Sequence, residues 1–188
     1  GQWIVTFQGY HGDFAPDDWA GALAWAGTLD QPAVHDMLAH ATPTTPVQRA
    51  RVPFYRWRHL ERLRTPPLGI VSLGDAMVTL DPTYGQGMGM ATLHAEALAR
   101  CLDAAPLDAL PRRFYREAAR VAEPLWLMCA SENFRFAQTI GEKPANLAFI
   151  NWYKTRVIRL AGSNDAVARA FYDVVHMLQP VSRLALPD

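Results

Sequence analysis

The chain has 188 residues, enough for one domain or parts of two, and half of them are hydrophobic. This composition, with 11% aromatic residues, excludes an intrinsically disordered chain. Eighteen basic residues balance 18 acidic ones, so the formal net charge is zero. The balance argues against a general electrostatic attraction to nucleic acid or to an anionic membrane, and we expect no nucleic-acid partner.

The first part of the chain predicts strands and two short helices. Residues 2–10 are rich in β-forming side chains and indicate a strand. Proline and aspartates at 16–18 favour the first turn of a helix, which the following Ala- and Trp-rich stretch continues. A second helix is expected over about 31–40. Side chains alternate from Val47 to Trp57, with arginines on one face, which is typical of a strand.

The rest of the chain predicts one more strand and then helices. A connector with two prolines leads to Ile70–Leu73, a continuous apolar run that is consistent with a strand buried on both faces. Helices are then expected in four stretches, at about 86–103, 107–136, 145–161 and 164–178. The predicted order is therefore sheet first, one strand–loop–helix unit in the middle, and helices last.

Three features bear on the cellular compartment. The chain starts without a signal-peptide pattern and has no run of 18 uninterrupted apolar residues, so we expect no transmembrane segment. Cys101 and Cys129 lack CxxC spacing and lie in helical sequence, which predicts buried thiols in a reducing compartment. The sequence thus predicts a cytoplasmic protein. Because the chain opens directly in strand-like sequence, we expect it to be the tail of a longer protein.

The stretch Leu73–Leu98 carries the strongest functional signal. Its strand ends in Asp75, and an aspartate at the carboxyl edge of a sheet suits a bidentate grip on sugar hydroxyls. Gly85, Gly87 and Gly89 follow where a helix begins, although each glycine weakens a helix. Glycines there expose backbone N–H groups and the positive end of the helix dipole. Together these features predict a ligand with a hydroxylated chain and a negative or anion-forming head.

These residues also resemble a known motif. Gly74-Asp75-Ala76, followed by Pro-Thr-Tyr-Gly-Gln-Gly-Met at 82–88, is similar to the second FAD-binding signature of flavin-dependent aromatic hydroxylases and related monooxygenases and epoxidases. The resemblance implies that the aspartate binds a hydroxyl of the FAD ribose or linker, and that N–H groups of the glycine-rich turn stabilise negative charge on the flavin. The cofactor-binding residues that it implies are Gly74, Asp75, Pro82, Gly85, Gln86, Gly87, Met88 and Gly89. It assigns no catalytic side chain and no metal ligand.

The resemblance further implies a fold and a division of the chain. The expected fold class is α+β, a fragment of an α/β FAD-binding fold of the p-hydroxybenzoate hydroxylase type, with a partial sheet before a largely helical C-terminal half. Residues 1–64 would end the substrate-binding sheet domain, 65–104 would form the last strand, loop and helix of the FAD-binding domain, and 105–188 a helical region. The family's G-x-G-x-x-G is missing. We therefore expect an N-terminal FAD-binding segment outside this chain, which alone would be inactive and without cofactor.

The activity that the resemblance implies is that of a monooxygenase or epoxidase, which uses FAD, NAD(P)H and O2 on an apolar small molecule. Two alternatives stay open: a non-catalytic binding or interaction module derived from the same fold, and a flavin-dependent reductase or halogenase. The sequence leaves open the substrate, the choice between NADH and NADPH, and the oligomeric state.

Other candidate sites have less support. The segment Arg49–Arg64 mixes arginines with aromatic residues, as some nucleic-acid-binding segments do, but we interpret it as a solvated or cofactor-facing strand. Either Arg49 or Arg51 could meet a phosphate of FAD or of the nicotinamide donor. The six histidines lack metal-ligand spacing and no G-x-S-x-G is present, so neither a metal site nor hydrolase chemistry is supported.

Overall fold

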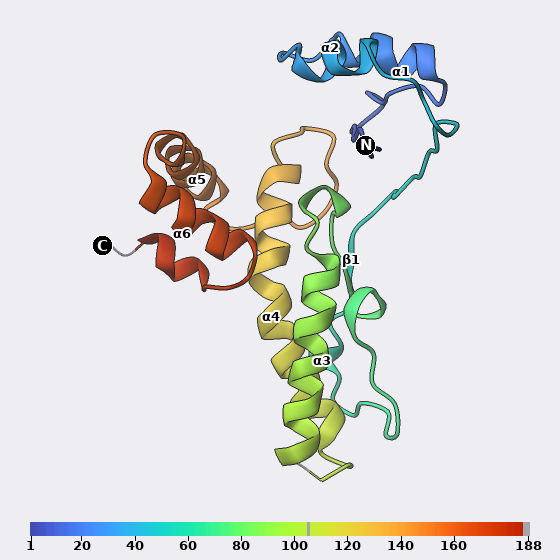
Figure 1. Ribbon diagram of the computed structural model, residues 1–188. Coiled ribbons are helices and arrows are strands. Elements are labelled where there is room, and N and C mark those ends of the chain that lie inside the picture. The colour runs from blue at the N-terminus through green and yellow to red at the C-terminus, as the bar shows by residue number, and fades with distance from the viewer. Residues whose placement is uncertain (105, 186–188) are drawn as a thin grey trace. The chain divides into compact units, whose positions relative to one another are not determined.

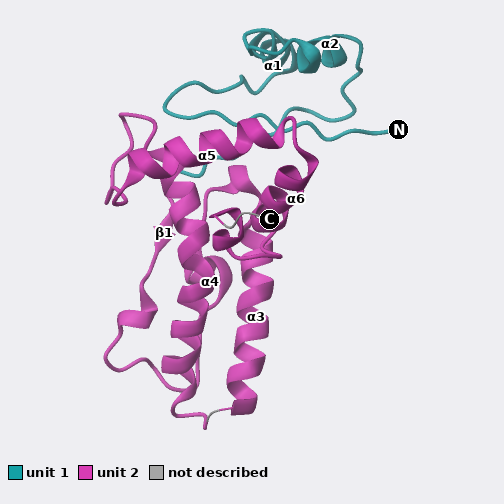
Figure 2. Ribbon diagram, turned by 90° about the vertical axis from the view of Figure 1, so that its left-hand side faces the viewer, with its two compact units in different colours: residues 1–53 teal, residues 54–188 magenta. Residues whose placement is uncertain are grey.

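The computed structural model describes residues 1–104 and 106–185. The chain forms two compact units, Gly1–Pro53 and Phe54–Asp188 (Figure 2). Each unit has its own helices and its own buried residues. The three domains that the sequence predicts refer to a longer protein, and that division stays a prediction.

The first unit is built from two short helices, α1 (Trp19–Ala26) and α2 (Ala33–Ala39). Asp18 precedes α1, and its carboxylate accepts a hydrogen bond of 2.8 Å from the N–H of Gly21. This bond satisfies one of the backbone donors that the first turn of a helix leaves unpaired. The buried apolar residues of the unit are Ala22, Ala26 and Leu38. Both helices lie where the sequence predicts them.

Strands are nearly absent from the described residues. The sheet there consists of β1 (Arg56–Trp57) and β2 (Val78–Thr79), two residues each, paired antiparallel with Arg56 opposite Thr79. The predicted fold class, an α+β fragment of an α/β FAD-binding fold with a partial sheet, is therefore wrong. The described chain is mostly helical (Figure 1).

Three stretches that the sequence predicts as strands form little or no strand in the structure. Residues 2–10 and Ile70–Leu73 contain no strand, and Val47–Trp57 contributes only the two residues of β1. The sequence predicts that Ile70–Leu73 is buried on both faces, but Ile70 is 64% exposed, so this prediction is wrong. An extended segment becomes a strand only when a neighbour pairs its N–H and C=O groups. Among the described residues of these stretches only Arg56 and Trp57 have such a neighbour, in β2.

Two long helices, α3 (Gly87–Ala104) and α4 (Leu110–Asn133), lie side by side in the second unit (Figures 1 and 2). Their buried side chains recur every three or four residues, which is the spacing of one helix face. Those of the two helices include Met90, His94, Ala97, Cys101, Phe114, Ala118, Ala122, Leu125 and Cys129. Both thiols are buried as predicted, and burial raises the pKa of Cys129 to about 12, so this thiol stays protonated at neutral pH.

The chain continues into α5 (Leu147–Ala161) and α6 (Asp165–Val175), which pack against each other (Figure 1). The end of α6 returns to the beginning of α3, where Gln86 Nε2 donates a hydrogen bond of 2.8 Å to the carbonyl of Val175. The four helices predicted from residue 86 onward are thus confirmed to within a few residues. None of the described helices combines the length and the apolar character needed to span a bilayer.

Within the described chain, three short 3-10 turns lie between these elements and a fourth follows α6. They are η1 (Leu60–Arg62), η2 (Gly74–Ala76), η3 (Pro82–Tyr84) and η4 (Val181–Ala185). The turns η2 and η3 flank β2 and precede α3. The residues that resemble the FAD-binding signature therefore fall on these two turns, on Gly85 and Gln86 after η3, and on the first turn of α3.

Candidate functional site

The predicted site begins at η2, which lies against α3. Gly74 has a φ of +55°, a left-handed backbone conformation that glycine adopts without strain. A Cβ on Gly74 would stand 3.1 Å from the Cβ of Ala91. Glycine is therefore required at this position by its backbone conformation and by the close approach of α3.

His94 joins η2 to both long helices. It is fully buried, its Nδ1 accepts a hydrogen bond of 3.1 Å from the N–H of Gly74, and its Nε2 donates one of 3.1 Å to the carbonyl of Ala118. Because an N–H group only donates and a carbonyl only accepts, the two bonds fix the neutral Nε2–H tautomer. Burial lowers the pKa of His94 below 6.5, while the bond to Ala118 acts in the opposite direction. Sequence reasoning missed this residue, whose only signal was its place on the apolar face of α3.

Asp75 presents its carboxylate beside the start of α3. Its Oδ1 lies 3.7 Å from the position that a Cβ of Gly87 would take. The backbone carbonyl of Asp75 accepts hydrogen bonds of 3.2 Å from Arg58 Nη1 and 3.1 Å from Thr79 Oγ1. The exposed carboxylate itself makes no hydrogen bond or ion pair with any described residue. The backbone of this residue is thus held in place while its side chain is available to a ligand.

The loop between β2 and α3 is a capped turn. Asp81 Oδ1 accepts a hydrogen bond of 2.9 Å from the N–H of Thr83, and Pro82 occupies the first position of η3. Gly85 ends the turn with a φ of +64° and donates its N–H to the carbonyl of Pro82 at 3.0 Å. The turn itself therefore accounts for the proline and for this glycine.

Two further residues of the motif contact the end of α6. Gln86 donates a hydrogen bond from Nε2 to the carbonyl of Val175. The other polar atom of its side chain, the buried Oε1, accepts no hydrogen bond from the described residues. A Cβ on Gly89 would stand only 2.3 Å from Cε of Met177, a residue that adopts a left-handed φ of +61°. Gly89 therefore makes room for this methionine, and both motif residues help to attach α6 to α3.

Gly87 and Met88 are the motif residues that neither a turn nor packing explains. A Cβ on Gly87 would meet only the Asp75 carboxylate, at an ordinary contact distance, and Met88 is 85% exposed. The N–H groups of residues 87–89 form the first turn of α3, so they have no acceptor in the helix, and none is found among the described residues. A carboxylate and three helix-start donors thus lie together, an arrangement that can hold a hydroxyl group beside an electron-rich edge.

Comparison with known proteins finds a relative whose name states no activity. No protein-family model matches the chain. The chain is similar to "Protein Rv3254" of Mycobacterium tuberculosis (strain ATCC 25618 / H37Rv), with 32% identity over 145 residues. The match covers 76% of this chain but only 31% of that protein, so the chain spans about a third of the length of this relative.

Proposed function

We propose that this chain is part of a flavin-dependent oxidoreductase, in which η2 and the first turn of α3 bind FAD. The observation that carries the proposal is the position of the Asp75 carboxylate, 3.7 Å from the Cβ position of Gly87. A carboxylate can accept a hydrogen bond from a ribose hydroxyl, and the adjacent N–H groups can face the electron-rich edge of the flavin. The proposal concerns this site and does not depend on the sheet that the sequence predicts.

The residues of the site fit such a cofactor in two respects. Gly87 leaves the main chain open at a position where its own packing would tolerate a side chain, so close approach by a ligand would explain the glycine. The dipole of the 18-residue α3 adds positive potential at the same point. In the proposal Asp75 orients the ribose or linker, and residues 87–89 orient the ring. FAD, when bound, would supply electron transfer from NAD(P)H and use of O2 on an apolar small molecule.

The remaining contacts to FAD would come from chain outside these residues. The relative is about three times as long as the aligned part, which is compatible with a longer protein that supplies them. A cytoplasmic location, consistent with a reduced nicotinamide donor, is part of the same proposal. A reductase or halogenase would use the site in the same way. Transfer of an oxygen atom from isotopically labelled O2 into an organic product would identify a monooxygenase, because O2 uptake alone also occurs when reduced flavin reacts with O2 directly.

The test uses the longer protein, expressed from the reading frame that contains this chain. We expect a yellow protein whose FAD affinity falls about 10- to 100-fold in Asp75→Asn, because a hydrogen bond to a charged group is lost. Gly87→Ala should also weaken FAD binding, because the added methyl group stands where the ligand approaches the main chain. The same substitution should raise the free energy of unfolding by about 0.5–1 kcal/mol, because alanine favours a helix. FAD fluorescence quenching and urea unfolding give the two readouts.

The matched control is Asp103→Asn, an exposed carboxylate at the other end of α3, which should leave FAD binding unchanged. A colourless full-length protein that ignores added FAD would reject the proposal. In that case the role of Asp75 is only structural, because its negative charge complements the start of α3. The Asp75→Asn substitution should then lower the free energy of unfolding and have no other effect.

A further inference from the structure

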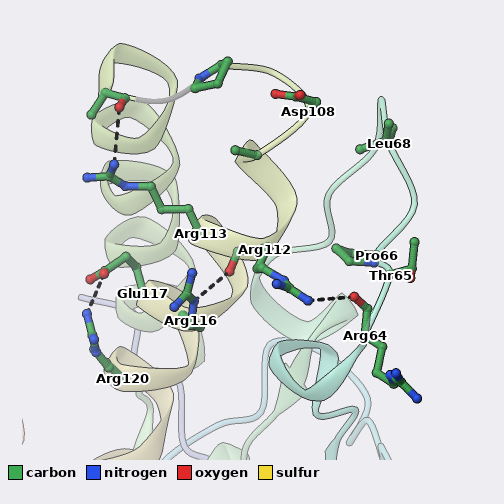
Figure 3. A pocket seen from close by; sticks show the side chains of 13 residues that line it. Arg64, Thr65, Pro66, Leu68, Asp108, Arg112, Arg113, Arg116, Glu117 and Arg120 are labelled. Carbon is green, nitrogen blue, oxygen red and sulfur yellow. Dashed lines mark hydrogen bonds and ion pairs between the residues drawn. The ribbon is translucent and has the colours of Figure 1, made fainter.

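A second site is suggested by the arginines of α4. Arg112, Arg116 and Arg120 are spaced four residues apart and lie on one side of the helix, and Arg113 adjoins them. With Arg64 they line a hollow of about 710 Å³ between the beginning of α4, the end of α3 and the 64–68 loop (Figure 3). All of these elements belong to the second unit.

The charge of this hollow is unbalanced. Five arginines line it against only two acids, Asp108 and Glu117, whereas the whole chain is neutral. Glu117 is already paired, since Arg120 Nη1 lies 2.5 Å from its Oε1. Like charges four residues apart destabilise a helix. The stripe formed by Arg112, Arg116 and Arg120 on α4 contains two such pairs. This arrangement is unfavourable, and an anionic ligand would relieve it.

Three of the guanidinium groups are held in position by neutral partners, whereas Arg120 is paired with Glu117. Arg112 Nη2 donates a hydrogen bond of 2.8 Å to the carbonyl of Arg64, Arg113 Nη1 donates one of 3.3 Å to that of Ala104, and Arg116 Nε donates one of 3.3 Å to that of Arg112 (Figure 3). Each bond uses one of the five N–H donors of a guanidinium. The remaining N–H donors stay available to a ligand. Because the bonded carbonyls are neutral, each of these guanidinium groups keeps its positive charge.

We propose that this hollow binds a ligand with two or more adjacent phosphate groups. Guanidinium groups bind phosphate oxygens in a bidentate manner, and several of them at close spacing match several linked phosphates better than one isolated anion. The walls also carry Pro66, Leu68 and Pro106, of which Leu68 is 65% exposed. This apolar rim suits the base of a nucleotide whose phosphates meet the arginines.

The site is independent of the proposed flavin site. Gly87 begins α3 and Ala104 ends it, so about 27 Å of helix separate the two. A ligand in the hollow therefore does not touch Asp75, and the inference does not rest on the proposed function.

The probe for the experiment is inorganic tripolyphosphate, titrated calorimetrically into the 188-residue chain at low and at physiological salt. We expect saturable binding that weakens with salt, and a loss of about tenfold in Arg116→Gln, because one charge-assisted contact is removed. The same substitution should leave Tm unchanged or raise it, since both like-charge pairs of the stripe disappear. Arg169→Gln, an exposed arginine of α6, is the matched control and should keep full affinity.

Competition by ATP identifies the source of the phosphates. ATP that displaces tripolyphosphate and binds more tightly supports a nucleotide, and equal affinity supports free polyphosphate. Absence of binding at low salt overturns the proposal, as does equal weakening by Arg116→Gln and Arg169→Gln. Binding to anionic vesicles or duplex DNA that tripolyphosphate cannot displace also overturns it, because the arginines would then serve an extended surface.

Discussion

At the scale of single residues, His94 is the side chain on which the candidate site depends most. It is fully buried and bonded at both nitrogens, to Gly74 in η2 and to Ala118 in α4. We expect His94→Leu to lower the free energy of unfolding by about 2–4 kcal/mol, because it leaves a buried N–H and a buried C=O unpaired. Urea unfolding measures this difference.

The same histidine predicts a pH dependence. Its pKa in the folded chain lies below 6.5, the ordinary value, because burial disfavours the charged form. Below pH 6.5 the unfolded chain therefore binds a proton that the folded chain does not, so the stability from His94 is present above that pH and is lost as the pH falls toward the lowered pKa. The slope inside this window is at most about 1.4 kcal/mol per pH unit.

The control for this dependence is His94→Gln, whose amide can accept from Gly74 and donate to Ala118 without titrating. Its unfolding free energy should fall less steeply below pH 6.5 than that of the natural sequence. Equal slopes for the two proteins would assign the acid sensitivity to other groups.

The three motif glycines next to the start of α3, Gly85, Gly87 and Gly89, show why residue roles are difficult to read from a sequence. All three fall at a helix start and invite one explanation, but the structure gives each its own. Gly85 has a left-handed φ, Gly89 makes room for Met177, and Gly87 has open space beside Asp75. Met177 is 88 residues from Gly89 along the chain, so no local pattern could have predicted that contact.

At the scale of elements, α4 and α5 are joined by a polar contact that is mostly shielded from solvent. Lys154 on α5 forms an ion pair with Glu132 and donates a hydrogen bond of 2.8 Å to Ser131 Oγ. The Lys154 side chain is 17% exposed, and Glu132 also pairs with Arg135 at 2.8 Å. This cluster fixes the attachment of the α5–α6 pair to the core.

We expect Lys154→Met to lower the free energy of unfolding by about 1–3 kcal/mol, because the part-buried Glu132 keeps only Arg135 as a partner. Lys143→Met changes an exposed loop residue in the same way and should stay within about 0.5 kcal/mol of the natural chain. Thermal and urea unfolding of the two variants provide the comparison. Equal stability in both would mean that methionine packing replaces the pair completely.

Helices and strands differ in how well the sequence predicts them. A helix pairs its own backbone, so periodicity and capping within one segment locate it, as for α1 behind Asp18 and for the long α3. A strand pairs with another segment, so the β-forming residues 2–10 and Ile70–Leu73 indicate only a tendency. In the described chain that tendency has no partner and no strand results.

The chain as a whole leaves many apolar side chains in contact with solvent. Trp3, Ile4 and Ile140 are 84%, 95% and 98% exposed, and the first two lie in a stretch predicted as a strand. Composition predicted a folded, aromatic-rich chain, and the buried face shared by α3 and α4 agrees with that. Composition carries no information about which apolar segments find a partner, because partner choice depends on the rest of the chain.

The division into two units gives a prediction for the whole chain. Arg49 and Arg51 are exposed in a stretch without helix or strand, just before the second unit begins at Phe54. Trypsin cleaves flexible, exposed backbone first, so brief digestion should cut after these arginines and leave a resistant fragment from about residue 52 onward. Arg100 and Arg120, within α3 and α4, are internal controls that should be cut far more slowly, and mass spectrometry identifies the products. Cleavage inside those helices at the same rate would show that the second unit does not hold together by itself.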